Sequence, residues 1–347
     1  MKRIVGLLVL VLALFTLTCC QQAPAPEERE AIALVTGLGG LGDNSFNDMG
    51  WSGTQWAGED FGLEPSVTEP KSMADLESIH RENARSGKYL VDVGLGYEHR
   101  DAVAAVAEDF PDQWFVLIDE VVDLPNVAAY TFRHREPAFL LGVLAAKMTT
   151  RTDLGNFNDD KTVGVVVAVD VPSIHECYTG FVAGAKWADP EVEVLFGEAG
   201  AWNDPSKANE IALSQYGQGA DIIWHVAGGS GLGVFEAAKT EDLYAFGTDV
   251  NQNPLDPDHI MASFLKLVDN AIYVATESAV KGEFEGDVYT LGIKEGGHDI
   301  TTEGTNIPVP AEYLELVQDA KDQIISGEIV PPQTDEELEA FLGSLSG

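Results

Sequence analysis

Three glycines near the N-terminus, Gly37, Gly39 and Gly42, have the spacing of a dinucleotide-binding turn, G-x-G-x-x-G. They follow the apolar run IALV at 32–35 and precede DNSFN at 43–47, where a helix is expected to begin. The glycines favour a phosphate cradle, and hence hydride chemistry on a nicotinamide nucleotide. The polar and aromatic residues after them favour a grip on an uncharged ligand at a helix N-terminus. The two interpretations imply different functions.

The residues at the expected helix start disfavour the phosphate cradle. Asp43 and Asn44 follow the third glycine, so a carboxylate would stand where the pyrophosphate should lie. An acidic residue is also expected about 20 residues further on, at the end of a second strand. Glu59 and Asp60 are the candidates, and neither ends a strand-like run. An NAD-binding oxidoreductase therefore stays an alternative, and we expect a binding protein without cofactor.

Strand-like and helix-like segments alternate along the chain, which predicts an α/β fold with doubly wound parallel sheets. The strand-like runs are continuous and apolar, as strands buried on both faces should be. They cover 32–36, 88–94, 114–119, 126–132, 162–169, 192–198, 220–228, 243–249 and 260–265, and the helical patterns cover 101–110, 136–148, 176–188, 207–219 and 233–240. About 320 mature residues are too many for one such core, so two lobes are expected.

Ligands of open α/β sheets bind beyond the carboxyl ends of the strands. The residues at those ends are two aromatics, several carboxylates and amides, glycines and one lysine. They predict a site for a flat, hydroxylated, uncharged molecule, stacked between aromatic faces and hydrogen-bonded by carboxylates. The candidate ligand-binding residues are Asp43, Ser45, Phe46, Asn47, Gly94, Asp119, Trp202, Gly228, Gly229, Asp249 and Lys266.

A series of motifs carries a family resemblance along nearly the whole mature chain, from Ala31 to Gly327. In order they are DNSFND, WFVLID, NVAAYTFRHREPAFLLGVLAA, GFVAGAKW, WNDPSKANEIA, GADIIWHVAGGSGLGVFEAAK, FGTDVNQ and SFLKLVD. Their joint order resembles the basic membrane lipoprotein family of ABC-importer solute-binding proteins, the purine nucleoside receptor group. The resemblance implies the type I periplasmic-binding fold, in which two Rossmann-like lobes joined by three crossovers close on a ligand.

The resemblance also implies roles for individual residues. Phe46 is similar to the phenylalanine that stacks on one face of the base, and Trp202 stands where the family usually has a phenylalanine on the other face. Asn47 and Asp119 match positions that bind the base edge, while Asp249 and Lys266 match positions that hold the ribose. Gly228 to Gly231 match a tight loop near the sugar. Asp43 and Ser45 match the motif too, but capping of the following helix is their expected role.

The N-terminus and the lobe boundaries complete the expected organisation. A basic start and an apolar run to Thr18 predict a lipoprotein signal peptide over 1–20, with Cys20 or Cys19 lipidated. A flexible tether follows over 21–30. Residues 31–131 plus 252–290 are expected in lobe 1 and residues 132–251 plus 291–347 in lobe 2, with hinges near Thr131, Asn251 and Leu291. The protein is expected to be exported, monomeric and membrane-anchored through its lipid alone.

Charge and the resemblance together narrow the partners and the function. The formal net charge of −37 disfavours nucleic acid as a partner. The histidines lack metal-ligand spacing, so no metal site is expected. We expect the protein to bind a nucleoside without changing it chemically, and the ABC permease and ATPase would be separate chains. A nucleoside hydrolase is the other alternative, but it needs an aspartate cluster that Asp43 and Asp48 form poorly.

Overall fold

The computed structural model describes residues 29–345, and its strands form two separate six-stranded sheets. The strand orders are β11-β5-β4-β3-β1-β2 and β12-β10-β9-β8-β6-β7. The expected signal peptide, Cys19, Cys20 and nearly all of the tether lie outside the described residues. The strands are β1 Ala31–Val35, β2 Glu64–Thr68, β3 Tyr89–Leu95, β4 Trp114–Ile118, β5 Val127–Phe132, β6 Thr162–Val167, β7 Glu193–Glu198, β8 Ala220–Val226, β9 Tyr244–Gly247, β10 Ile260–Lys266, β11 Val288–Leu291 and β12 His298–Thr301.

Every strand pair is parallel except β10 with β12. The inner strands are buried along their length, as in β6 and β8, because helices cover both faces of each sheet. The continuous Val- and Ile-rich runs of these strands are expected when helices pack against both faces of a sheet. The predicted α/β class with two mainly parallel sheets is confirmed.

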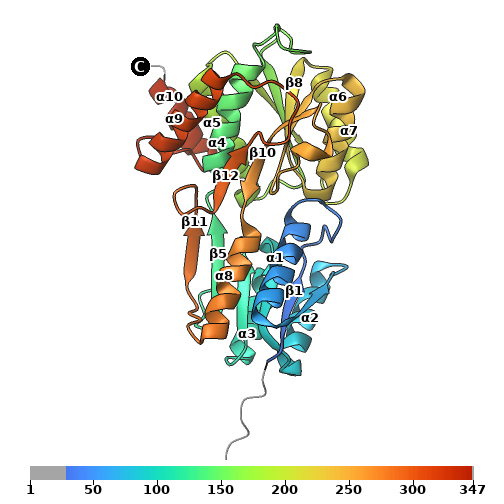
Figure 1. The fold of residues 1–347 in the computed structure, drawn as a ribbon, viewed down its shortest axis with the longest axis vertical. Coiled ribbons are helices and arrows are strands. Elements are labelled where there is room, and N and C mark those ends of the chain that lie inside the picture. The colour runs from blue at the N-terminus through green and yellow to red at the C-terminus, as the bar shows by residue number, and fades with distance from the viewer. Residues whose placement is uncertain (1–28, 346–347) are drawn as a thin grey trace, which may run out of the picture.

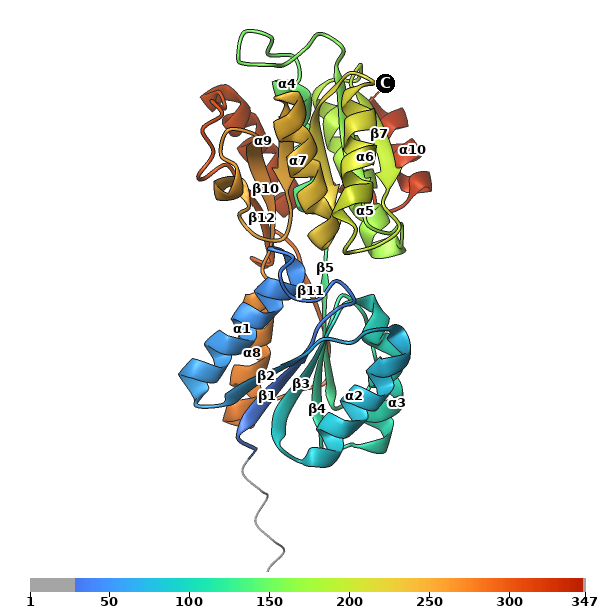
Figure 2. The same ribbon diagram turned by 90° about the vertical axis from the view of Figure 1, so that its right-hand side faces the viewer.

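Ten helices of the described chain cover the four sheet faces, and each face has its own apolar cluster. In the first sheet, α1 and α8 lie on one face and α2 and α3 on the other (Figure 2). In the second, α6 and α7 cover one face, and α4, α5, α9 and α10 the other. The helices are α1 Phe46–Phe61, α2 Met73–Ser86, α3 Arg100–Asp109, α4 Arg135–Met148, α5 Pro172–Ala188, α6 Pro205–Tyr216, α7 Leu232–Glu241, α8 Val268–Lys281, α9 Ala311–Ser326 and α10 Asp335–Leu345.

The two sheets define two lobes that lie end to end, with the chain passing between them three times (Figure 1). We call the first sheet with its helices lobe 1 and the second lobe 2. The crossings run from β5 to α4, from β10 to α8 and from β11 to β12. Arg133 at the first crossing pairs with Glu295 at the third, with 2.5 Å between Nη1 and Oε2.

One predicted boundary is wrong by a strand. Residues 252–290 were expected in lobe 1, but β10 pairs with β9 and β12 in the second sheet. The chain returns to lobe 1 only at α8, so the second crossing lies at Leu267 and not at Asn251. The physical reason is that the apolar run IMASFL fills the position between β9 and β12, where both faces are buried.

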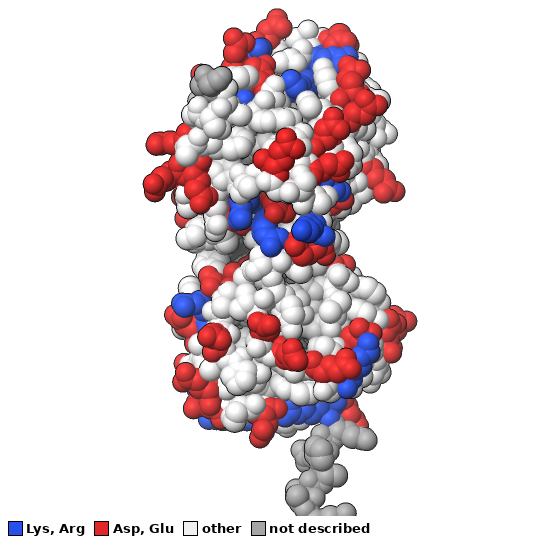
Figure 3. Space-filling model, turned by 90° about the vertical axis from the view of Figure 1, so that its left-hand side faces the viewer, with Lys and Arg blue, Asp and Glu red and all other residues white. Residues whose placement is uncertain are grey.

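Acidic side chains spread over both lobes on the face seen in Figure 3, and basic side chains are fewer and partly gathered where the lobes meet. Among residues 29–345, no helix combines the length and apolar character that a bilayer span requires. Cys177 is the one cysteine of the described chain and is buried in α5 as a free thiol. Burial raises the pKa of this thiol well above its usual range, so it acts as a small apolar side chain.

Candidate ligand-binding site

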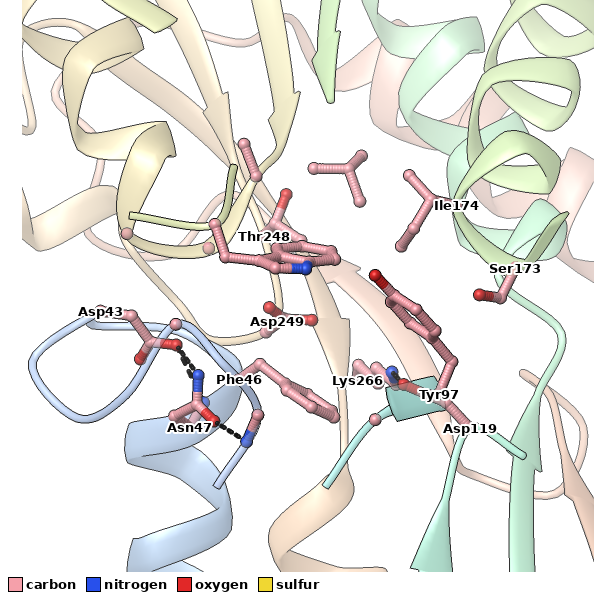
Figure 4. A pocket seen from close by; sticks show the side chains of 18 of the residues that line it. Asp43, Phe46, Asn47, Tyr97, Asp119, Ser173, Ile174, Thr248, Asp249 and Lys266 are labelled. Carbon is pink, nitrogen blue, oxygen red and sulfur yellow. Dashed lines mark hydrogen bonds and ion pairs between the residues drawn. The ribbon is translucent and has the colours of Figure 1, made fainter. Parts of the chain in front are cut away.

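A cavity lies between the lobes, at the carboxyl ends of the parallel strands of both sheets. Nine residues predicted from the sequence line it: Asp43, Phe46, Asn47, Asp119, Trp202, Gly228, Gly229, Asp249 and Lys266. The close view in Figure 4 shows Asp43, Phe46 and Asn47 arriving from the start of α1, with Tyr97, Asp119 and Lys266 on the other side. Most of the residues that were predicted from their positions at strand ends therefore lie together around one cavity.

Two carboxylates fasten the glycine loop that precedes α1. Asp43 accepts hydrogen bonds from the backbone N–H groups of Ser45 (2.9 Å) and Asp48 (3.2 Å). Asp48 in turn accepts from the backbone N–H groups of Gly42 and Asn44, both at 2.8 Å. The backbone donors that a pyrophosphate would need are thus occupied by the chain's own acidic side chains. The geometry gives no support to the dinucleotide-binding alternative.

Asn47 serves the loop as well as the cavity. Its Oδ1 accepts from the backbone N–H of Gly37 at 2.8 Å, and its Nδ2 donates to Asp43 Oδ2 at 3.0 Å (Figure 4). Because Gly37 N can only donate, the orientation of this amide is fixed. One N–H of Asn47 then remains for a ligand. Burial is the main cause that raises the pKa of Asp43, and the hydrogen bonds from Asn47, Ser45 and Asp48 oppose it.

The two aromatic residues of the prediction come from different lobes. Phe46 is the first residue of α1 in lobe 1, and Trp202 belongs to the loop before α6 in lobe 2. The backbone of the Trp202 loop is held by Ser230, whose N–H donates to Trp202 O at 2.9 Å. A Cβ on Gly228 would lie 3.4 Å from Trp202 Cε3, so the indole packs closely over this glycine turn. The glycines after β8 therefore position the aromatic wall.

The floor of the cavity holds a buried ion pair between the lobes. Lys266 Nζ at the end of β10 lies 2.5 Å from Asp119 Oδ2 at the end of β4. The same ammonium lies 4.5 Å from the centroid of the Phe46 ring and 5.0 Å from that of Phe132. Asp119 Oδ1 faces His134 Nε2 at 3.6 Å and has no hydrogen-bond partner within the described chain. It is free to accept a hydrogen bond from a ligand.

Asp249 is the second carboxylate that is held across the lobes. Ser45 Oγ donates to Asp249 Oδ2 at 2.5 Å, from the start of α1 to the end of β9. Burial raises the pKa of Asp249, while Lys266 and the Ser45 hydroxyl oppose the shift. Asp249 therefore accepts a hydrogen bond from lobe 1 and also lines the cavity.

Two predicted residues do not line the cavity. Ser45 is fully buried behind it and acts through Asp249. Gly94 packs against His99, where a Cβ would come within 3.0 Å of the ring. His99 Nε2 lies 3.0 Å from Thr36 O and its Nδ1 lies 2.9 Å from His80 Nε2, so Gly94 makes room for a buried chain that supports the end of β1.

Several lining residues were not among the predicted site residues: Gly37, Leu38, Gly39, Gly96, Tyr97, Glu98, His134, Ser173, Ile174, Cys177, Val226, Ala227, Thr248 and Phe264. Tyr97 and Glu98 follow β3 after one intervening residue, and Ser173 and Ile174 lie in the first turn of α5 after β6, so the strand-end rule could have found them. Phe264 lies inside an apolar strand, and nothing in the sequence distinguishes it from core.

Comparison with known proteins gives consistent matches over almost the whole chain. A family model described as "ABC transporter substrate-binding protein PnrA-like" matches residues 31–335. The chain is 30% identical to an uncharacterized lipoprotein of Pyrococcus furiosus, over 94% of this chain and 88% of that one. It is also 30% identical to the ABC transporter nucleoside-binding protein BmpA of Lactococcus lactis, over 86% and 88%. A solute-binding protein structure from Aeropyrum pernix superposes with a TM-score of 0.81 at 28% identity, over 91% of this chain and 97% of that one.

Proposed function

The chain belongs to the PnrA-like family of ABC transporter substrate-binding proteins, and from this premise we propose that it captures a purine nucleoside between its lobes. The observation that carries the proposal is the placement of Phe46 on lobe 1 and Trp202 on lobe 2, both lining one cavity. A planar base between two aromatic faces gains stacking and apolar burial together. An aliphatic ligand has no planar face to stack on these two aromatic rings.

The charges around the cavity favour a nucleoside over a nucleotide. Asp43, Glu98, Asp119 and Asp249 line the cavity with Lys266 as its one lysine or arginine among the described residues. An excess of carboxylates repels phosphate groups, whereas carboxylates accept hydrogen bonds from ribose hydroxyls. We assign the ribose to Asp249 and Lys266 and the base to the two aromatic rings.

Binding without chemistry follows from the family's role as importer receptors. The closed protein would dock on a permease driven by an ATPase, both on separate chains. A lipid on Cys20, or on Cys19, would anchor the exported monomer to its membrane. This assignment is supported by the signal-like N-terminus and by relatives described as lipoproteins.

Replacement of Trp202 by alanine tests the proposed site. Trp202→Ala should weaken guanosine or inosine binding by about tenfold or more in isothermal titration calorimetry, because one stacking face and its buried area are lost. Trp56→Ala is the matched control, since Trp56 is 42% exposed on α1 and stacks on Tyr273 outside the cavity. Equal nucleoside affinities of the two variants would remove Trp202 from the site.

A further inference from the structure

Glu98 is a buried carboxylate to which no other residue of the described chain donates a hydrogen bond. It lies in the short 3-10 turn Tyr97–His99 after β3, is 6% exposed and lines the cavity. Asp43, Asp119 and Asp249 each accept a hydrogen bond from another residue. For Glu98 the described chain provides only its own backbone N–H. A desolvated carboxylate with a single donor is costly to bury, and such a group at a binding site points to a ligand that supplies further donors.

The position of Glu98 suits the edge of a stacked ring. A Cβ placed on Gly96 would lie 2.6 Å from Glu98 Oε2 and 3.8 Å from Cε1 of Phe46. Glu98 and the Phe46 ring therefore both lie beside the same glycine and close to each other in the cavity lining. A base that stacks on Phe46 is therefore within reach of the Glu98 carboxylate through its hydrogen-bonding edge.

We propose that Glu98 reads the edge of the base and makes the site selective for a 6-oxopurine nucleoside with adjacent N–H donors, guanosine above inosine and both above adenosine. This inference rests on the proposed function. Guanine presents its N1–H and its 2-amino group side by side, and the two oxygens of one carboxylate can accept both. Adenine presents the N1 lone pair there, which repels a carboxylate.

The protonation of Glu98 gives the inference a second, independent signature. Burial raises the pKa of Glu98 to about 7, and the neighbouring Asp119 adds to this effect. About one-tenth of the Glu98 side chains are then ionised at pH 6 and about nine-tenths at pH 8. Guanine donors need the ionised form, whereas adenine N1 needs the protonated form. Guanosine affinity should therefore rise with pH, and adenosine affinity should not.

Other titratable groups share the cavity, so the pH dependence must be assigned by mutation. They are Asp43, Tyr97, Asp119, His134, Cys177, Asp249 and Lys266. Glu98→Gln keeps the size of the side chain and removes its charge. Its amide still accepts from N1–H, but its NH2 group faces the 2-amino group of guanine as donor against donor. The variant should lose guanosine affinity and the pH dependence together.

Calorimetric titration of guanosine, inosine and adenosine at pH 6 and pH 8 tests the inference. We expect guanosine to bind the wild type about tenfold more tightly at pH 8 than at pH 6. Glu98→Gln should bind guanosine about tenfold or more weakly than the wild type at pH 8, with no pH dependence. Glu108→Gln, on the exposed side of α3, is the matched control and should behave as the wild type.

Two outcomes separate this inference from the proposed function. If the wild type binds these nucleosides but Glu98→Gln keeps guanosine affinity and its pH profile, or adenosine is preferred, Glu98 does not read the base. If the wild type binds none of the three nucleosides at either pH, the proposed function itself fails.

Discussion

Asp119 and Asp249 have backbone φ angles of +71° and +69°, in the left-handed region that non-glycine residues rarely adopt. Both follow the carboxyl end of a strand and both line the cavity. Such conformations persist where surrounding contacts hold them, and they gather at ligand sites. Here Lys266 holds Asp119 and Ser45 holds Asp249. The two turns aim their carboxylates at the space between the lobes.

The Asp119–Lys266 pair should govern stability as well as binding. Lys266→Met leaves the Asp119 carboxylate buried without its cation, which should lower the free energy of unfolding by about 3–5 kcal/mol in urea titrations. The double variant Lys266→Met/Asp119→Asn should recover most of this loss, because no unpaired charge remains. Lys281→Met, which removes the 52% exposed partner of Glu277, should change stability by less than about 1 kcal/mol. A similar loss in both lysine variants would contradict a buried pair.

At the scale of elements, α4 and α5 approach so closely that glycine is required between them. A Cβ on Gly184 of α5 would lie 1.9 Å from Phe139 O, and one on Gly142 of α4 would lie 2.1 Å from Phe181 O. The backbones of the two helices therefore pack directly on each other. This rigid pair carries Ser173 and Ile174 into the cavity at the start of α5.

Gly184→Ala should be strongly destabilising, because backbone atoms cannot move aside as a side chain can. We expect it to lower the free energy of unfolding by about 3 kcal/mol, measured by chemical unfolding. Gly343→Ala in α10 meets no atom within 4 Å and should instead stabilise the protein by up to about 1 kcal/mol. A glycine-to-alanine substitution is thus expected to lower the free energy of unfolding in α5 and to raise it in α10. A neutral Gly184→Ala would show that α4 and α5 are not tightly packed.

The elements also explain how far the sequence could predict the structure. The nine strands expected from apolar runs all form, but β2, β11 and β12 were not expected. All three are edge strands with mostly half-exposed residues, so they lack the continuous apolar signal of inner strands. Most of the site residues could be predicted because they follow the carboxyl ends of strands that are recognisable in the sequence. The partners of those residues, such as Ser45 for Asp249, depend on how the two lobes meet, which no local pattern records.

At the scale of the whole molecule, the lobes contact each other directly as well as through the three crossings. Ser45 Oγ donates to Asp249 Oδ2 at 2.5 Å, and Gln252 Nε2 donates to Asn44 O at 2.9 Å. Together with the Lys266–Asp119 pair, these bonds stabilise the closed arrangement around the cavity. A ligand shifts a population toward closure only through contacts that the closed form alone provides. The contacts between the lobes determine how much of the ligand-free protein is already closed.

Ser45→Ala should shift the ligand-free protein toward the open arrangement. Ser45 makes no side-chain capping bond to α1, so its hydroxyl acts between the lobes and its removal should leave the helix intact. We expect a larger radius of gyration than the wild type in small-angle X-ray scattering without ligand, and nucleoside affinity lower by several-fold, in proportion to the closed fraction. Saturating nucleoside should restore the wild-type radius, because bound ligand favours closure in both proteins. Ser52→Ala, on the exposed side of the same helix, should match the wild type throughout. If Ser45→Ala and Ser52→Ala scatter and bind alike, the bond to Asp249 does not control the distance between the lobes.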